Sequence, residues 1–140
     1  MDNLQNFLCF KLGSAARSMQ KYYNSRCAEY GITIAQSFIL FSLLSSDGLN
    51  PKTMAEQLEI DGSAITGLVD RLEKEGLVER RPDPRDRRAF CVFLTRKGRN
   101  KAEDALPAAM EVNKRLKASL GRGDEQAVTR FLDKVKDLDQ

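Results

Sequence analysis

The segment LVERRPDPRDRRAFCVFLT, residues Leu77–Thr95, decides the fold. Its two ends, LVERR and AFCVFLT, are rich in residues that favour strands, and Pro82 and Pro84 lie between them. Prolines at these positions forbid a helix and are typical of turns. The pattern therefore predicts a β-hairpin with a cluster of arginines at its tip.

Positive charge is concentrated on and just after this hairpin. Between Arg80 and Lys101 there are nine Lys or Arg and only two acids, Asp83 and Asp86, whereas the whole chain carries a net charge of +3. A basic cluster is most often an ordinary solvated surface. The function of this basic cluster therefore has to be inferred from the elements beside the hairpin.

Two short helices are predicted just before the hairpin. The first begins with Asn50 as its cap and Pro51 at its first position, where the missing N–H costs nothing, and it ends near Ile60. The second begins beyond residues 61–63 and stops at Gly76, a left-handed cap. The residues expected to point inward are Met54, Ala55, Leu58, Ile65, Leu68, Val69 and Leu72. This spacing fits a helix-turn-helix, and on spacing alone it fits an ordinary helical hairpin of a bundle equally well.

The order of the elements favours the first alternative. A helix-turn-helix followed at once by a basic hairpin is a winged helix, which offers DNA one helix for the major groove and a projecting loop for phosphates or the minor groove. The expected fold class is mainly α with a small β-hairpin wing. A winged helix-turn-helix lobe would then be joined to terminal helices that form a dimerisation region.

Helices are predicted on both sides of this lobe. Apolar residues at steps of three and four predict a long first helix from Leu4 to about Tyr30, and residues 34–44 predict a buried central helix. After the hairpin, Thr95 is expected to cap a long helix that Pro107 kinks.

Asp124 is expected to cap the last helix. The terminal helices carry apolar stripes with no domain of their own to cover, which indicates a dimer interface. We expect one unit over residues 1–140, with the DNA-binding lobe at 32–98 and the dimerisation region at 1–31 and 99–140.

The composition argues against an enzyme and against a metal site. Histidine is absent, and the three cysteines, Cys9, Cys27 and Cys91, form no C-x-x-C pair. No signal segment or membrane span is recognisable, since the longest uncharged stretch is shorter than the roughly 20 apolar residues a span requires. We expect a cytoplasmic protein that is not an enzyme and needs no cofactor or metal.

The segment LEKEGLVERRPDPRDRRAFCVFLTRKG, Leu72–Gly98, resembles the MarR family of bacterial transcriptional regulators almost position by position. Weaker agreement in helix order extends over nearly the whole chain. The resemblance implies a homodimer whose first and last helices intertwine and whose two winged lobes bind the half-sites of a pseudo-palindromic operator in double-stranded DNA.

The resemblance also implies roles for the hairpin tip. Arg88 takes the place of the wing arginine that enters the minor groove, and Asp86 takes the place of an acid that holds this arginine. A planar, permanently charged guanidinium suits a narrow groove. Arg85 and Arg87 are better assigned to phosphates. Asp86 as a plain surface acid is the alternative.

Other candidate contacts lie on the two helices of the helix-turn-helix. On the second helix, the residues off the buried stripe could face the groove: Ser63, Ala64, Thr66, Gly67, Asp70 and Arg71. Arg71 suits either a guanine edge or a phosphate. Lys52 and Thr53, at the start of the first helix, could hold a phosphate, with solvated surface as an equal alternative.

The stretch LCFKL, Leu8–Leu12, resembles the start of the peroxide-sensing OhrR subgroup. The resemblance implies a redox sensor at Cys9 with Tyr23 as one of its phenol partners, while Ile34 stands where the second phenol would be. A cysteine in an apolar stripe is otherwise a small buried hydrophobe. The rival trigger is a small aromatic ligand bound between the dimer helices and the winged lobe.

These observations together predict a sequence-specific DNA-binding transcriptional regulator, a repressor relieved by a small ligand or an oxidant. Two alternatives stay open. One is a winged-helix protein-interaction module without specific DNA binding, and the other is a Cys9-centred peroxide sensor of the OhrR type.

Overall fold

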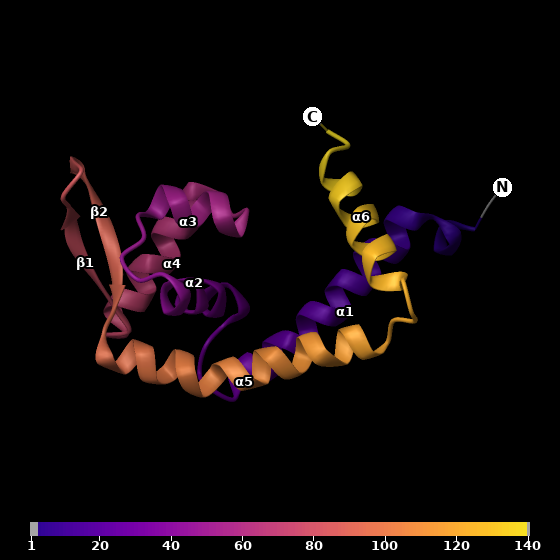
Figure 1. Cartoon of the computed structure of the whole chain (residues 1–140), viewed down its shortest axis with the longest axis horizontal. Helices are drawn as coiled ribbons and strands as arrows, with labels where there is room; N and C mark the ends of the chain where they lie inside the picture. The colour runs from indigo at the N-terminus through magenta and orange to yellow at the C-terminus, as the bar shows by residue number, and fades with distance from the viewer. Residues whose placement is uncertain (1–2, 140) are drawn as a thin grey trace.

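A computed structural model describes residues 3–139 of the chain. One 3-10 turn, six α-helices and two strands follow one another in it (Figure 1). They are η1 (Leu4–Asn6), α1 (Leu8–Ala28), α2 (Ile34–Ser45), α3 (Pro51–Leu58), α4 (Gly62–Lys74), β1 (Val78–Asp83), β2 (Asp86–Leu94), α5 (Arg96–Ala118) and α6 (Asp124–Lys136). The predicted fold class, mainly α with a β-hairpin wing, is confirmed.

Helix α2 forms the centre of the hydrophobic core, as its apolar sequence predicts. Ile39, Leu40 and Leu43 are completely buried, and α2 contacts α5, β2 and α1. Its first turn is held by a capping box, in which Thr33 and Gln36 exchange side-chain-to-backbone hydrogen bonds of 3.2 and 3.0 Å. The remaining core residues come from the helix-turn-helix, the base of the hairpin and the inner face of α5. They include Met54, Ile65, Val69, Leu72, Leu77, Val78, Val92, Ala102 and Ala105.

Local signals start and stop the helices of the helix-turn-helix. The Asn50 side chain accepts a hydrogen bond of 2.8 Å from the N–H of Thr53, so α3 begins where the sequence predicts. It ends at Glu59, which has left-handed backbone angles (φ 54°). Gly76, after α4, also has a positive φ of 74°, as expected for a left-handed cap. The helices α3 and α4 pack against each other and against the core.

The hairpin is antiparallel, with Val78 opposite Leu94 at its base. Only Pro84 and Arg85 lie between the two strands, so the tip is a tight turn. A single bridge between Leu49 and Val92 attaches the outer edge of β2 to the α2–α3 loop. The tip stands away from the helices at one end of the molecule (Figure 1).

Helix α5 connects the winged lobe to the far end of the molecule. Thr95 caps it by accepting a hydrogen bond of 3.0 Å from the N–H of Gly98. The helix continues through Pro107 as one element, which is bowed along its length (Figure 1). Its Ala108 and Val112 are buried, and α5 packs against both α1 and α2.

The N-terminal part differs from the predicted single helix of Leu4 to Tyr30. Asn3 caps a separate turn, η1, and Phe7 then takes extended backbone angles, so α1 begins only at Leu8 and ends at Ala28. The periodic apolar pattern did not reveal this break, because Leu4, Phe7 and Leu8 keep helical spacing on both sides of it. All three side chains are exposed.

Helix α6 begins at Asp124, so that Gly123, and not Asp124 as predicted, is its N-cap, and the helix has no buried residue. Its apolar side chains Val128, Phe131 and Leu132 are each about 40% exposed. An apolar stripe open to solvent on a terminal helix is typical of an interaction surface. None of the helices within residues 3–139 combines the length and the apolar character needed to cross a membrane.

Candidate nucleic-acid interface

The tip of the hairpin carries three arginines that are free to meet an anion. Arg85, Arg87 and Arg88 are all exposed, and within residues 3–139 none of them has an acid within ion-pair distance. Elsewhere in the same segment, Arg80, Arg81 and Arg99 are paired with acids of this chain, and Lys97 and Lys101 donate to backbone carbonyls. The arginines at the tip therefore differ from those nearer the base of the hairpin, Arg80 and Arg81, whose charges are paired.

Arg80 belongs to the paired set and joins the wing to α4. Its guanidinium forms ion pairs with Asp70 and with Glu73, the latter at 3.6 Å, and lies 4.6 Å above the ring of Phe90. The carboxylate of Asp70, which is predicted among the groove-facing residues, is thus paired with Arg80 of the hairpin. Arg80 lies two residues after the buried Val78, on the same face of β1, and this alternation was the signal that could have revealed its role.

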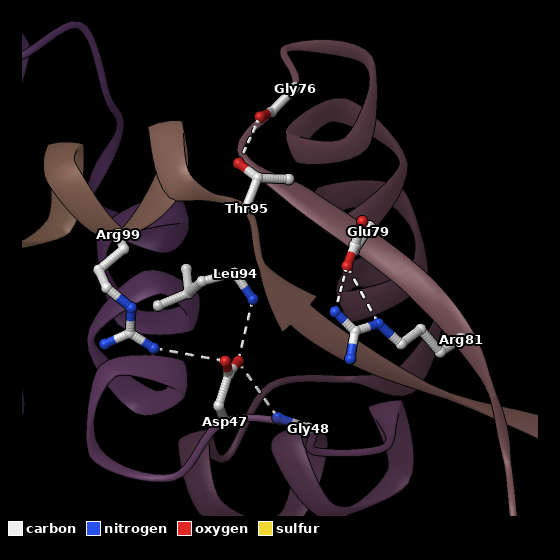
Figure 2. A network of polar contacts seen from close by, with 8 residues as sticks. All are labelled: Asp47, Gly48, Gly76, Glu79, Arg81, Leu94, Thr95 and Arg99. Atoms are coloured by element: carbon white, nitrogen blue, oxygen red, sulfur yellow. Dashed lines mark hydrogen bonds and ion pairs between the residues drawn. The ribbon is translucent and has the colours of Figure 1, made fainter.

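Arg81 is also neutralised within the wing. Its Nε donates to Glu79 Oε1 at 3.0 Å (Figure 2). Its guanidinium also lies 4.2 Å above the ring of Phe93. Stacking and pairing hold Arg81 against the outer part of the hairpin. It is consequently not one of the free cations.

Two aspartates shape the tip through the backbone. Asp83 Oδ1 accepts the N–H of Arg85 at 2.9 Å, and Asp86 Oδ1 accepts the N–H of Arg88 at 2.9 Å. Such bonds to the residue two further on are typical of aspartates in turns. The resemblance implies that Asp86 holds the Arg88 side chain, whereas within residues 3–139 the observed bond joins Asp86 to the Arg88 main chain and no ion pair joins the two side chains.

Helix α4 presents an uncovered face of small residues. Ser63, Ala64, Thr66 and Gly67 are exposed, and a Cβ at Gly67 would meet nothing within 4 Å. The Thr66 hydroxyl donates to the carbonyl of Gly62 at 3.1 Å and the Ser63 hydroxyl to Asp61 at 2.8 Å. Both hydroxyls keep acceptor lone pairs for an outside donor.

Arg71 is exposed at the end of this face and has no acid within ion-pair distance in the described part of the chain. It adds an unpaired positive charge to a surface that a partner can approach closely.

Thr53 and Arg85 lie on opposite walls of one groove. This groove, of about 490 Å³, runs between the α2–α3 loop with the start of α3 and the hairpin tip. Lys52, next to Thr53, is exposed. The N–H of Thr53 is already bonded to Asn50, so the hydroxyl and the neighbouring lysine are the groups left to bind an anion here.

Cys9 and Tyr23 do not meet within one chain. They lie 14 residues apart on α1, which is about 21 Å along a helix. Cys9 is exposed. The Tyr23 hydroxyl lies 3.3 Å from the Ser37 hydroxyl, and burial raises the pKa of the Tyr23 phenol despite that hydrogen bond.

The other two cysteines are poorly suited to act as thiolates. Burial raises the pKa of the Cys27 thiol. The pKa of the Cys91 thiol is raised first by burial and then by the nearby Asp83. Because the thiolate is the reactive form, both positions favour an inert thiol at neutral pH. Within residues 3–139 no cluster of three or more Cys, Asp or Glu is placed to hold a metal ion.

A cavity of about 190 Å³ lies between α1, α2 and α5. Its wall is largely apolar, with Met19, Tyr23 and Phe38 on one side and Leu116 on the other, and Gln20 and Asn113 add polar groups. A cavity of this size accommodates a single aromatic ring. Apart from Tyr23, sequence reasoning named none of these residues as binding residues, because side chains on three separate helices show no shared spacing.

Comparison with known proteins gives a consistent set of similarities. Residues 32–90 match the model of the MarR family. The chain is 36% identical over 97 residues to the HTH-type transcriptional regulator TtmR of Methylorubrum extorquens, covering 69% of this chain and 50% of that protein. It is 35% identical over 95 residues to the organic hydroperoxide resistance transcriptional regulator of Bacillus subtilis, covering 68% of this chain and 65% of that protein.

The matched parts thus span between half and two thirds of the length of these two relatives. Similarity to a solved structure extends further along the chain. The crystal structure of a MarR transcriptional regulator from Methanosarcina mazei superposes with a TM-score of 0.75 at 29% identity, covering 94% of each chain. The terminal helices as well as the winged lobe therefore follow the arrangement seen in that structure.

Proposed function

Since the chain belongs to the MarR family, we propose that it is a sequence-specific DNA-binding transcriptional regulator of the repressor type that acts in the cytoplasm. The observation that carries this proposal is that the winged lobe has two exposed surfaces suited to DNA. Three unpaired arginines form the wing tip, and α4 offers a face of small residues. No catalytic role is assigned to any residue.

In the proposed complex, α4 lies in the major groove and the wing reaches past it. Ser63, Ala64, Thr66 and Gly67 allow a close approach to base edges, and Arg71 reads a guanine or holds a phosphate. Arg88 enters the minor groove, with its backbone fixed by Asp86.

Phosphates are held by the remaining basic residues of the lobe. Arg85 and Arg87 contact the DNA backbone from the tip, and Lys52 and Thr53 contact it from the start of α3. Thr53 and Arg85 line the same groove, which makes a single phosphate between them a natural arrangement.

The active form we propose is a homodimer. The lobe of residues 32–98 binds one half-site, while residues 1–31 and 99–140 supply the dimerisation region, with the exposed stripe of α6 in the interface. Half-sites are then about one helical turn apart, roughly 10 bp or a multiple. A ligand that shifts the two lobes by a few ångströms breaks simultaneous binding of both half-sites.

The most direct test is selection of bound duplexes from a random pool by the purified protein. We expect a pseudo-palindromic sequence to be enriched over bulk DNA. Enrichment of no sequence, together with binding to an acidic protein partner, would favour the interaction-module alternative.

Arg88→Ala is expected to weaken binding to the selected duplex by about 1–3 kcal/mol while leaving the thermal unfolding temperature unchanged. The wing arginine is lost, while its side chain is exposed and forms no ion pair with the residues that the structure describes. Fluorescence anisotropy titrations measure the affinity. Arg122→Ala is the matched control, because Arg122 is exposed in the α5–α6 loop at the opposite end of the molecule from the wing (Figure 1). Equal losses for the two variants would remove the wing assignment.

Two signals that release the protein from DNA are compatible with this proposal. The cavity between α1, α2 and α5 favours a small aromatic ligand. The exposure of Cys9, and the similarity to a regulator named for organic hydroperoxide resistance, favour oxidation of Cys9.

Replacement of Cys9 separates the two triggers. If oxidation is the trigger, an organic hydroperoxide releases the wild type and Cys27→Ser from the selected duplex, whereas Cys9→Ser stays bound. Release of Cys9→Ser at the same peroxide concentration as the wild type would leave the cavity ligand as the trigger. Retention on the duplex is read by anisotropy over a peroxide titration.

A further inference from the structure

We propose that Asp47, in the loop between α2 and α3, is a positioning residue for the wing. This inference rests on the proposed DNA binding and adds to it a residue outside the wing, on the opposite side of the groove that Arg85 lines. Asp47 is on neither the hairpin nor the helix-turn-helix helices, yet its carboxylate contacts β2, α5 and its own loop (Figure 2).

The first contact completes the outer edge of β2. Asp47 Oδ1 accepts the N–H of Leu94 at 2.9 Å. Two residues earlier on the same edge, the N–H of Val92 donates to the carbonyl of Leu49 at 2.8 Å. Alternate residues of a strand present their N–H groups on the same side. The carboxylate therefore takes the place of the next carbonyl of a third strand that this two-stranded sheet lacks.

The second contact organises the loop itself. The N–H of Gly48 lies 3.2 Å from Asp47 Oδ1 and 3.1 Å from the carbonyl of Val92. Gly48 has a positive φ of 78°, and a Cβ there would lie 2.7 Å from the ring of Phe93. The loop is thus pressed closely against β2, with Asp47 at its start.

The third contact reaches the helix that leads away from the wing. Asp47 Oδ2 lies 3.4 Å from Nη2 of Arg99, in the first turn of α5 (Figure 2). Both side chains are partly exposed, so this pair alone stabilises little. The Asp47–Arg99 pair matters because it orients the Asp47 carboxylate and holds it between the end of β2 and the start of α5.

The contact of Asp47 with Leu94 matters because the hairpin is long and has only two strands. Two strands without a further sheet are only marginally stable by themselves. The nine residues of β2 span roughly 26 Å, so a tilt of about 10° at Leu94 moves the tip by about 4–5 Å. Arg85, Arg87 and Arg88 lie at that tip. Asp47 consequently sets where these arginines meet the DNA without touching it.

Asp47→Ala tests the proposal at two levels. Without DNA, we expect faster hydrogen exchange at the Leu94 amide and lower ¹⁵N order parameters at Arg87 and Arg88, because the edge acceptor is lost. With the selected duplex, we expect affinity to fall by up to about tenfold, and by less than about twofold when Arg88→Ala is already present, since the loss passes through the wing.

Two further variants distinguish positioning from general destabilisation. Asp47→Asn keeps an oxygen acceptor for Leu94 and should restore both the tip order and the affinity. Asp104→Ala also removes one negative charge, but from an exposed site on α5 that has no ion-pair partner in the described part of the chain. It should change neither the order of the tip nor the affinity for the duplex.

Unchanged exchange at Leu94 and unchanged tip order in Asp47→Ala would overturn the proposal, as would an affinity loss of the same size in the Arg88→Ala background. The relaxation and exchange measurements need no DNA. If the wild type selects no duplex, the proposed function fails while these measurements still decide the role of Asp47.

Discussion

Gly98→Ala is expected to lower the free energy of unfolding by more than about 3 kcal/mol, a large fraction of the total stability of a small domain. Gly98 is buried in the first turn of α5, where an added Cβ would lie 1.8 Å from the carbonyl oxygen and 2.7 Å from the carbonyl carbon of Leu77. The obstructing atoms are backbone, so no side-chain rotation relieves the clash.

The clash falls at a joint that several hydrogen bonds hold. The carbonyl of Leu77 accepts the N–H of Thr95 at 3.1 Å, and the Thr95 hydroxyl donates to the carbonyl of Gly76 at 2.6 Å (Figure 2). Moving α5 away from Leu77 to make room for a methyl group breaks these bonds and separates α5 from the base of the wing. The cost therefore exceeds that of a simple overpacked side chain.

Thermal and urea unfolding followed by circular dichroism at one fixed protein concentration measure this effect. Gly67→Ala is the matched control, because Gly67 also lies in a helix but a Cβ there meets nothing. It should stabilise the protein by up to about 1 kcal/mol through helix propensity. A Gly98→Ala protein as stable as the wild type would show that α5 does not dock on Leu77 as described.

Leu132→Glu is expected to convert the dimer into a monomer and to reduce affinity for the selected duplex by about 10²- to 10⁴-fold. Leu132 lies in the exposed apolar stripe of α6 with Val128 and Phe131. A buried carboxylate in the dimer interface is costly, while in the monomer this side chain is already 42% exposed. Losing the partner removes the second half-site contact, which supplies most of the affinity.

Sedimentation velocity gives the oligomeric state, and anisotropy gives the affinity. Gln126→Glu adds the same charge on the opposite side of α6 and should remain dimeric. A Leu132→Glu protein that stays dimeric would place the interface elsewhere, and a monomeric one with full affinity would contradict binding by two linked lobes.

Local sequence signals predicted the winged lobe well because they act over a few residues. Asn50 with Pro51, Gly76 and Thr95 each fix a helix end through their own side-chain or backbone chemistry. The two prolines near the tip and the strand-forming residues on either side of them similarly fixed the hairpin.

Contacts between distant residues were not predictable in the same way. The pairing of Asp70 with Arg80 joins α4 to β1, and the bond from Leu94 to Asp47 spans 47 residues. Strand alternation places Arg80 on the inner face of β1 but does not identify Asp70 as its partner, and no sequence pattern links Leu94 to Asp47. The break at Phe7 was hidden for a different reason, since a change in backbone angles left the apolar periodicity intact.

The central claim is that the unpaired arginines of the wing tip bind DNA as part of a sequence-specific dimer. The most direct test is the salt dependence of binding to the selected duplex, compared with a scrambled duplex of the same composition. With Arg85, Arg87 and Lys52 assigned to phosphates in each protomer, we expect log K to fall with log salt with a slope of about −5, and the selected duplex to bind at least about 10³-fold more tightly. Equal affinity for the two duplexes, or a slope near zero, would contradict the account.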